Sequence, residues 1–156
     1  MSSCQNEQFD YPGRDEDLKR QLNETKSGTY DVNSNSKIVT KTTEVYCTTQ
    51  MAGIHNWPGC PFDEVSYLRD PHRHMFHIKA HKLVTHSDRD VEFIMLKHLI
   101  EEYLNMEYWH DQHKCLYFGA MSCEMIAEEL INKFDLCRCE VSEDGENGAI
   151  ITVEDV

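Results

Sequence analysis

The stretch HRHMFHI at residues 72–78 decides how this chain folds and where its chemistry lies. Side chains of an extended strand point alternately to the two sides of a sheet, so His72 and His74 leave the strand on the same side. A third histidine, His55, ends an upstream segment that is also typical of a strand. Three neutral imidazoles that leave a fourth position to water are typical of catalytic zinc. The pattern predicts a zinc site at these three residues, although nine histidines in 156 residues can also produce the H-x-H spacing by chance.

Further short motifs follow the histidine pair along the chain. They are the segments DVEFIMLK at 90–97, MSCEMIAE at 121–128 and VSED at 141–144, with AGIH at 52–55 before the pair. In order and spacing they resemble the patterns A-A-H, H-G-H-x-[FY]-x-[VI], D-F-x-x-L-K, P-T-x-E-N-[LI]-A and V-x-V-x-E-T of the 6-pyruvoyltetrahydropterin and 6-carboxytetrahydropterin synthase family. The resemblance covers residues 51 to about 153, roughly two thirds of the chain.

The resemblance implies a T-fold domain with a zinc ion held by His55, His72 and His74. It implies a pterin-like or purine-like ring anchored by Glu143, because a carboxylate accepts two parallel N–H bonds from an aminopyrimidine edge. Glu124 either supports this ligand or only stabilises a helix N-terminus through its charge. The family's activity implies a lyase of pterin or 7-deazapurine biosynthesis. Its intersubunit pockets imply a homo-oligomer, a trimer or a hexamer.

Two departures from the family patterns bear on catalysis. Family members have a cysteine four residues before the histidine pair, and this position is Leu68, which cannot take up a proton. The family's L-D-H motif has no clear counterpart either. The substitutes that we expect for proton transfer are His110, Asp111, His113 and, if its loop folds back over the metal, Cys60. The alternatives are a relative that binds the pterin- or purine-like ligand without turnover, and an assembly protein whose histidines are structural.

Composition argues against several other classes of protein. The chain has 15 Lys and Arg against 28 Asp and Glu, a formal net charge of −13, which disfavours a nucleic-acid partner. No run approaches the roughly 20 apolar residues of a membrane span, and the N-terminus lacks the pattern of a signal peptide. We therefore expect a cytoplasmic protein without a membrane partner. The seven cysteines are an odd number and are expected to be reduced thiols.

The polar residues 1–36 predict a flexible arm, and residues 37–156 predict the T-fold domain. Hydrophobic periodicity predicts helices over 94–104 and 122–134. Strands are expected over 37–55, 72–86 and 90–93 and in a final hairpin over 136–153. This order predicts an α+β fold, in which a four-stranded antiparallel sheet carries both helices on one face.

Overall fold

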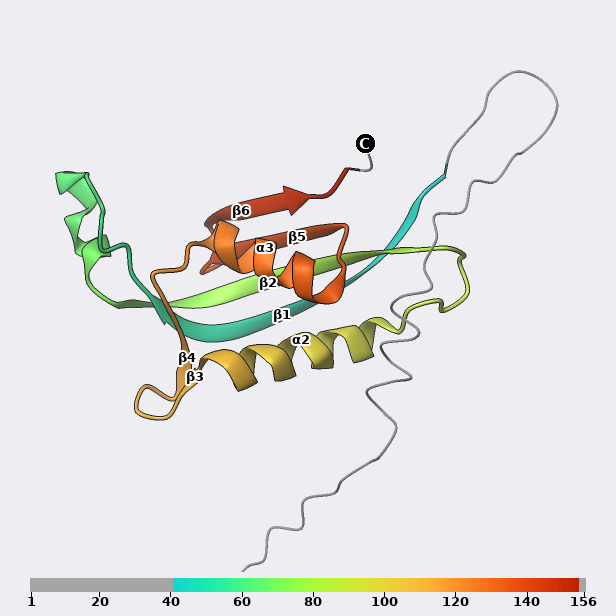
Figure 1. Cartoon of the computed structure of the whole chain (residues 1–156), viewed down its shortest axis with the longest axis horizontal. Helices are drawn as coiled ribbons and strands as arrows, with labels where there is room; N and C mark the ends of the chain where they lie inside the picture. Colours follow the sequence, from blue (N-terminus) through green and yellow to red (C-terminus); the bar gives the residue numbers. More distant parts are fainter. Residues whose placement is uncertain (1–40, 155–156) are drawn as a thin grey trace, which may run out of the picture.

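Two long strands form the centre of the computed structural model, which describes residues 41–154 (Figure 1). Strand β1 (Thr43–His55) pairs antiparallel with β2 (His72–Val84) over all 13 residues of each. Their Thr, Val, Tyr and Ile side chains favour extended backbone. A 3-10 helix, η1 (Asp63–Arg69), lies in the loop that joins them. The predicted arm, residues 1–36, lies outside the described residues.

The sheet has six strands in the order β3-β4-β1-β2-β5-β6, so the prediction of four strands is wrong. The expected final hairpin is present as β5 (Arg138–Glu143) and β6 (Asn147–Thr152). The two additional strands are β3 (Trp109–His110) and β4 (Cys115–Gly119), and β4 runs parallel to the end of β1. These strands are too short for a periodic signal, which is why the sequence does not distinguish them from a loop.

The strand expected over 90–93 is also wrong. Glu92 instead caps helix α2 (Phe93–Tyr108), and its carboxylate accepts a hydrogen bond from the backbone N–H of Ile94 at 3.0 Å. This contact satisfies one of the N–H groups that a helix leaves free at its start. Asp90 accepts from the backbone N–H of Thr85 at 2.6 Å, which closes the turn between β2 and the helix.

Both helices cover one face of the sheet, as predicted (Figure 1). Helix α3 (Cys123–Phe134) follows its cap Ser122, whose hydroxyl accepts from the N–H of Met125. The Tyr103 ring of α2 packs edge-on against Phe134 of α3, so the helices lie side by side. The apolar core between helices and sheet includes a buried stripe from each helix. The stripe consists of Leu96, Ile100 and Leu104 in α2 and of Cys123, Ile126, Ala127, Leu130, Ile131 and Phe134 in α3.

A buried lysine ties the sheet to the end of α3. Lys82 is 1 % exposed, and its ammonium donates to the carbonyl oxygens of Phe134 at 2.9 Å and Asp135 at 2.8 Å. Asp135 has a left-handed φ of 52° and ends the helix. A cation at a helix C-terminus satisfies free carbonyl groups and the helix dipole together. Within the described part of the chain, no helix has the length and apolar character that a membrane crossing requires.

Candidate metal centre and ligand cavity

Three histidines meet at the end of the central strand pair. The register places His55, the last residue of β1, directly opposite His72, the first residue of β2, and places His74 opposite Gly53. All three side chains lie on the face that further along β2 carries the buried Phe76. One ligand atom from each imidazole lies within 4.8 Å of the other two. The structure thus brings together the three residues that the sequence identifies as zinc ligands.

Each of the three imidazole rings is oriented by a hydrogen bond at its Nδ1 atom. Nδ1 of His55 lies 3.0 Å from the carbonyl oxygen of Met121, and Nδ1 of His72 lies 2.8 Å from that of Asp70. Nδ1 of His74 lies 2.6 Å from a carboxylate oxygen of Asp144. Since carbonyl and carboxylate oxygens only accept, each Nδ1 carries a proton, and in the neutral form of each imidazole Nε2 carries a lone pair.

The three Nε2 atoms are buried, and none of them has a hydrogen-bond partner among residues 41–154. A buried nitrogen without a partner is unfavourable in the absence of a ligand, because it has lost its water. Burial also lowers the pKa of His55, although hydrogen bonding to Met121 and the charge of Glu143 oppose this, so the imidazole is held in the neutral form that a metal requires. The donor set therefore fits a zinc ion with three imidazole ligands.

The packing of aromatic rings next to the three histidines depends on the small size of Gly53. The Phe76 ring meets His55 edge-on at a centroid distance of 5.2 Å and His74 at 6.1 Å. A Cβ atom on Gly53 would lie 2.9 Å from the Phe76 ring and 2.8 Å from that of Phe118, closer than such contacts occur. The absent side chain leaves room for Phe76 to pack against the imidazoles and for Phe118 to pack against Phe76, which limits the movement of the imidazoles.

Glu143 faces the same three-histidine group from β5. One carboxylate oxygen lies 3.1 Å from Nε2 of His55, and the other lies 3.5 Å from Nε2 of His74. Both members of each contact carry lone pairs when the imidazoles are neutral, so the contact is repulsive unless a cation or a proton lies between them. A metal ion on the imidazoles would turn this repulsion into attraction.

A cavity of about 500 Å³ opens beside the histidines. Its lining includes His55, His72 and Glu143 together with Leu68, the position that the family pattern gives to cysteine. Glu124 also lines the cavity, and a hydrogen bond with Ser122 lowers the pKa of its carboxyl group. The cavity therefore joins the candidate metal centre to Glu143, the predicted anchor of the ring, and to Glu124, for which the sequence leaves a ligand contact and a purely helix-stabilising role open.

The cavity contains one thiol that sequence reasoning missed. Cys123, the first residue of α3, is buried, and its Sγ lies 3.6 Å from a carboxylate oxygen of Glu143. Burial, reinforced by the charge of Glu143, raises the pKa of this thiol to about 12. The residue occupies the variable position of the P-T-x-E pattern, so nothing in the sequence distinguishes it from a core cysteine.

The four residues expected to transfer protons lie elsewhere in the described chain. The Cys60 thiol is buried in its own loop, where it contacts the carbonyl oxygens of Phe62 and Val65. His110 and His113 pack against each other in the β3–β4 hairpin, with ring centroids 4.6 Å apart. Asp111 accepts a hydrogen bond from the indole of Trp109. None of the four is among the described residues that line the cavity of their own subunit.

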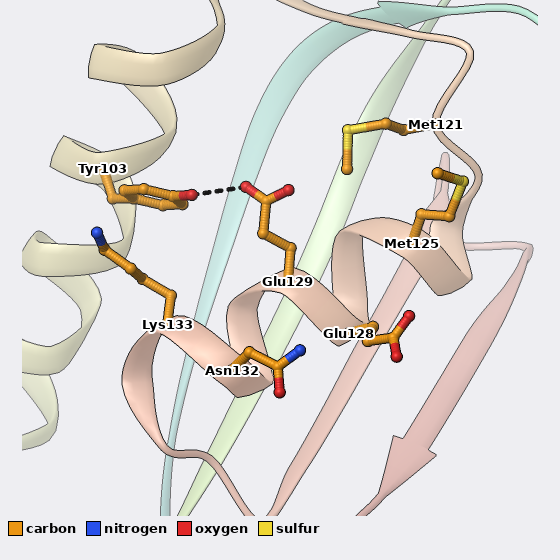
Figure 2. A pocket seen from close by; sticks show the side chains of 7 residues that line it. All are labelled: Tyr103, Met121, Met125, Glu128, Glu129, Asn132 and Lys133. Atoms are coloured by element: carbon orange, nitrogen blue, oxygen red, sulfur yellow. Dashed lines mark hydrogen bonds between the residues drawn. The ribbon is translucent and has the colours of Figure 1, made fainter.

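A second hollow, of about 520 Å³, lies between α2 and α3 (Figure 2). Glu129 extends from α3 toward Tyr103 of α2, whose hydroxyl donates to it at 2.7 Å, and Tyr108 donates to the same carboxylate at 2.6 Å. Burial raises the pKa of Tyr103 to about 12, so its hydroxyl remains a donor. Met121 lines both hollows. The polar groups of this second hollow join the two helices.

Comparisons with known proteins support the fold. No protein-family model matches the sequence, and a sequence comparison with curated proteins finds no relative. Among solved structures, the chain is similar to 6-pyruvoyl tetrahydropterin synthase of Caenorhabditis elegans, with a TM-score of 0.54 and 9 % sequence identity. The match covers 73 % of this chain and 97 % of the worm protein. At this identity the likeness establishes a shared fold.

Proposed function

We propose that this protein binds zinc through His55, His72 and His74 and acts on a pterin- or purine-like substrate in the adjacent cavity. The reaction class is that of the 6-pyruvoyl and 6-carboxytetrahydropterin synthases, which are lyases of pterin and 7-deazapurine chemistry. The observation that carries the proposal is the convergence of three buried Nε2 atoms, which have no hydrogen-bond partner in the described part of the chain, beside the carboxylate of Glu143. The shared fold with the worm synthase supports it independently.

The cavity suits a small heterocycle in size and polarity. Its volume of about 500 Å³ falls in the usual range of ligand pockets, roughly 300–1,000 Å³. Leu68 and Met121 contribute apolar surface to its lining, which suits the faces of a flat ring. Glu143 supplies two oxygens for the N–H groups along one edge of the ring. A zinc ion on the imidazoles would supply a Lewis acid that polarises an oxygen of the substrate's side chain.

The groups that we propose for proton transfer are the side chains of His110, Asp111, His113 and Cys60. His110, Asp111 and His113 lie on the β3–β4 hairpin, and Cys60 lies near η1. Their side chains do not line the cavity of their own subunit. If the protein is an enzyme, a neighbouring subunit or a movement of the loop must therefore bring one of these residues to the substrate.

Ligand binding without catalysis is the second candidate function. Leu68 lines the cavity and has no group that takes up a proton. The thiol that does line the cavity, Cys123, is kept protonated by its raised pKa of about 12, so it is a weak base and nucleophile. These two residues favour a protein that retains the zinc and the ring site and sequesters or senses a pterin- or purine-nucleotide-like ligand.

The edges of the sheet support a homo-oligomer. Among the described residues, β4 pairs with β1 only at Gly53–His55, so the outer edge of β1 from 43 to 52 has no strand partner within the subunit. The other edge is β6, where Ile150 is 59 % exposed. Unpaired edges favour pairing with another chain. We propose a trimer or hexamer in which these two edges meet.

Binding and turnover together test the proposed function. Zinc-loaded protein is titrated with a pterin and with a 7-deazapurine, and turnover is assayed on dihydroneopterin triphosphate. Glu143→Gln is expected to weaken ring binding by about 10-fold to 100-fold, because it replaces a charged acceptor of two hydrogen bonds. Glu146→Gln, an exposed change in the same hairpin turn, is the matched control and should bind like the wild type.

The outcomes separate the two functions. Turnover that depends on Glu143 supports the enzyme, and a further loss in His110→Ala, His113→Ala or Cys60→Ala identifies the source of the proton. Tight binding without turnover, lost in Glu143→Gln, supports the binding protein. A zinc-loaded protein that neither binds nor converts any of these compounds contradicts the proposal.

A further inference from the structure

Among the described residues, Asp144 is the one whose side chain contacts the Nδ1 atom of a histidine in the three-histidine group. Its Oδ2 lies 2.6 Å from Nδ1 of His74, and its Oδ1 accepts from the backbone N–H of Met75 at 2.8 Å. The backbone N–H of Asp144 in turn donates to the carbonyl oxygen of Met75 at 2.8 Å. Both carboxylate oxygens are therefore engaged by neighbouring residues of β2.

The other two histidines are held differently. His55 and His72 donate from Nδ1 to the backbone carbonyl oxygens of Met121 and Asp70. A carbonyl oxygen is a neutral dipole, whereas a carboxylate carries a full charge and forms a shorter and stronger bond with an N–H donor. His74 thus differs from His55 and His72 because the acceptor at its Nδ1 atom is charged.

We propose that Asp144 is a positioning residue that fixes His74 with its Nε2 lone pair toward the metal and increases the electron-donating strength of that nitrogen. This inference rests on the zinc site of the proposed function. Histidine ligands commonly donate their second N–H to a carboxylate, and loss of such a partner typically weakens metal binding about 10-fold to 100-fold. Without the carboxylate, His74 is free to exchange tautomers and to turn its ring.

The position of Asp144 in the hairpin turn also links it to Glu143. Asp144 directly follows Glu143, and its left-handed φ of 54° directs the chain from β5 into the hairpin turn. The two neighbouring carboxylates therefore contact opposite sides of one imidazole, Glu143 at Nε2 and Asp144 at Nδ1. Anchoring Asp144 to Met75 also fixes the end of β5 from which Glu143 reaches the cavity.

Two variants test the role with residues that accept the left-handed φ of this turn position. Asp144→Asn keeps the shape and removes the charge, and Asp144→Gly removes the acceptor. Both residues tolerate a positive φ, which alanine does not. Glu146→Gln, exposed in the same turn, is the control. Far-ultraviolet circular dichroism and thermal unfolding of the chelator-treated proteins establish that each variant is folded.

Zinc affinity is measured by competition with a chromophoric chelator, and the tautomer of His74 by long-range ¹H–¹⁵N correlation spectra of the metal-free protein. We expect zinc binding about 10-fold to 100-fold weaker in both variants and unchanged in the control. The spectra should show the Nδ1–H tautomer of His74 in the wild type and a mixture of tautomers in Asp144→Gly.

Each result decides one of the two claims. If the wild type binds one zinc per subunit but both Asp144 variants bind it equally well, the role of Asp144 is wrong and the zinc site stands. If the wild type itself binds no zinc, the metal part of the proposed function fails and this inference fails with it. Weakened binding with an altered His74 tautomer supports the inference.

Discussion

A carboxylate oxygen of Glu143 lies 3.1 Å from Nε2 of His55, although the two residues are far apart in the sequence. Because Nδ1 of His55 donates to a carbonyl oxygen, both atoms of this contact carry lone pairs. Such an arrangement is stable when a cation lies nearby. The contact therefore links the imidazoles that would hold a metal with the carboxylate that would hold a ring.

Removal of the metal is expected to destabilise the protein. The wild type should bind about one zinc per subunit. His72→Ala should abolish tight binding, because it removes one of the three imidazole ligands and leaves only two. His86→Ala, an exposed histidine beyond the end of β2, should retain stoichiometric zinc. Metal analysis after gel filtration and thermal unfolding with and without chelator check this prediction. A His72→Ala protein that retains its zinc would exclude the proposed site.

Gly53→Ala is expected to lower the free energy of unfolding by about 1–3 kcal/mol, the usual cost of overpacking a core. The new Cβ would lie within 3 Å of the rings of Phe76 and Phe118, which cannot both move away in a packed interior. The control is Gly59→Ala in the β1–η1 loop, where a Cβ has no neighbour within 4 Å. Urea denaturation measures both changes, and equal stability of the two variants would contradict the packing argument.

Lys82→Met is expected to destabilise the fold by about 2–4 kcal/mol, because it leaves the carbonyl oxygens of Phe134 and Asp135 without their buried donor. Lys79→Met is the matched control on the opposite face of β2, where the ammonium lies 4.7 Å from the centre of the Tyr46 ring. This control should change the stability by less than about 1 kcal/mol. Chemical denaturation curves compare the two, and a neutral effect of Lys82→Met would rule out a role in capping α3.

Cys123 is expected to resist alkylation by iodoacetamide at pH 8. The thiolate is the reactive form, and a pKa of about 12 leaves very little of it until the solution is strongly alkaline. Cys137, which is only partly buried, serves as the internal reference and should react first. Peptide mass spectrometry follows both residues over time between pH 7 and 10. Faster labelling of Cys123 than of Cys137 at pH 8 would show an activated thiol and would favour the enzyme over the binding protein.

Local periodicity predicted the main elements because each depends on neighbours in the sequence. The spacing of Leu96, Ile100 and Leu104 identified α2, and the alternation around His72 and His74 identified β2 and the face from which the pair projects. The extra strands β3 and β4 were not predicted, and residues 90–93 were expected to form a strand. The two strands form by pairing with β1, and the exact start of α2 depends on the folded chain around Glu92, which no short pattern specifies.

The sequence by itself therefore determined the order of the two long strands, the two helices and the final hairpin, the two helices on one face and the identity of three histidines able to share a metal. Only the tertiary structure decided how they meet, through the register that sets His55 opposite His72 and the acceptors that direct each Nε2 inward. It also decided that Asp144 contacts His74 and that the thiol of Cys123 contacts Glu143. The reason is physical: side-chain periodicity is a local property of the chain, whereas strand register and hydrogen bonds between distant loops arise only when the core packs.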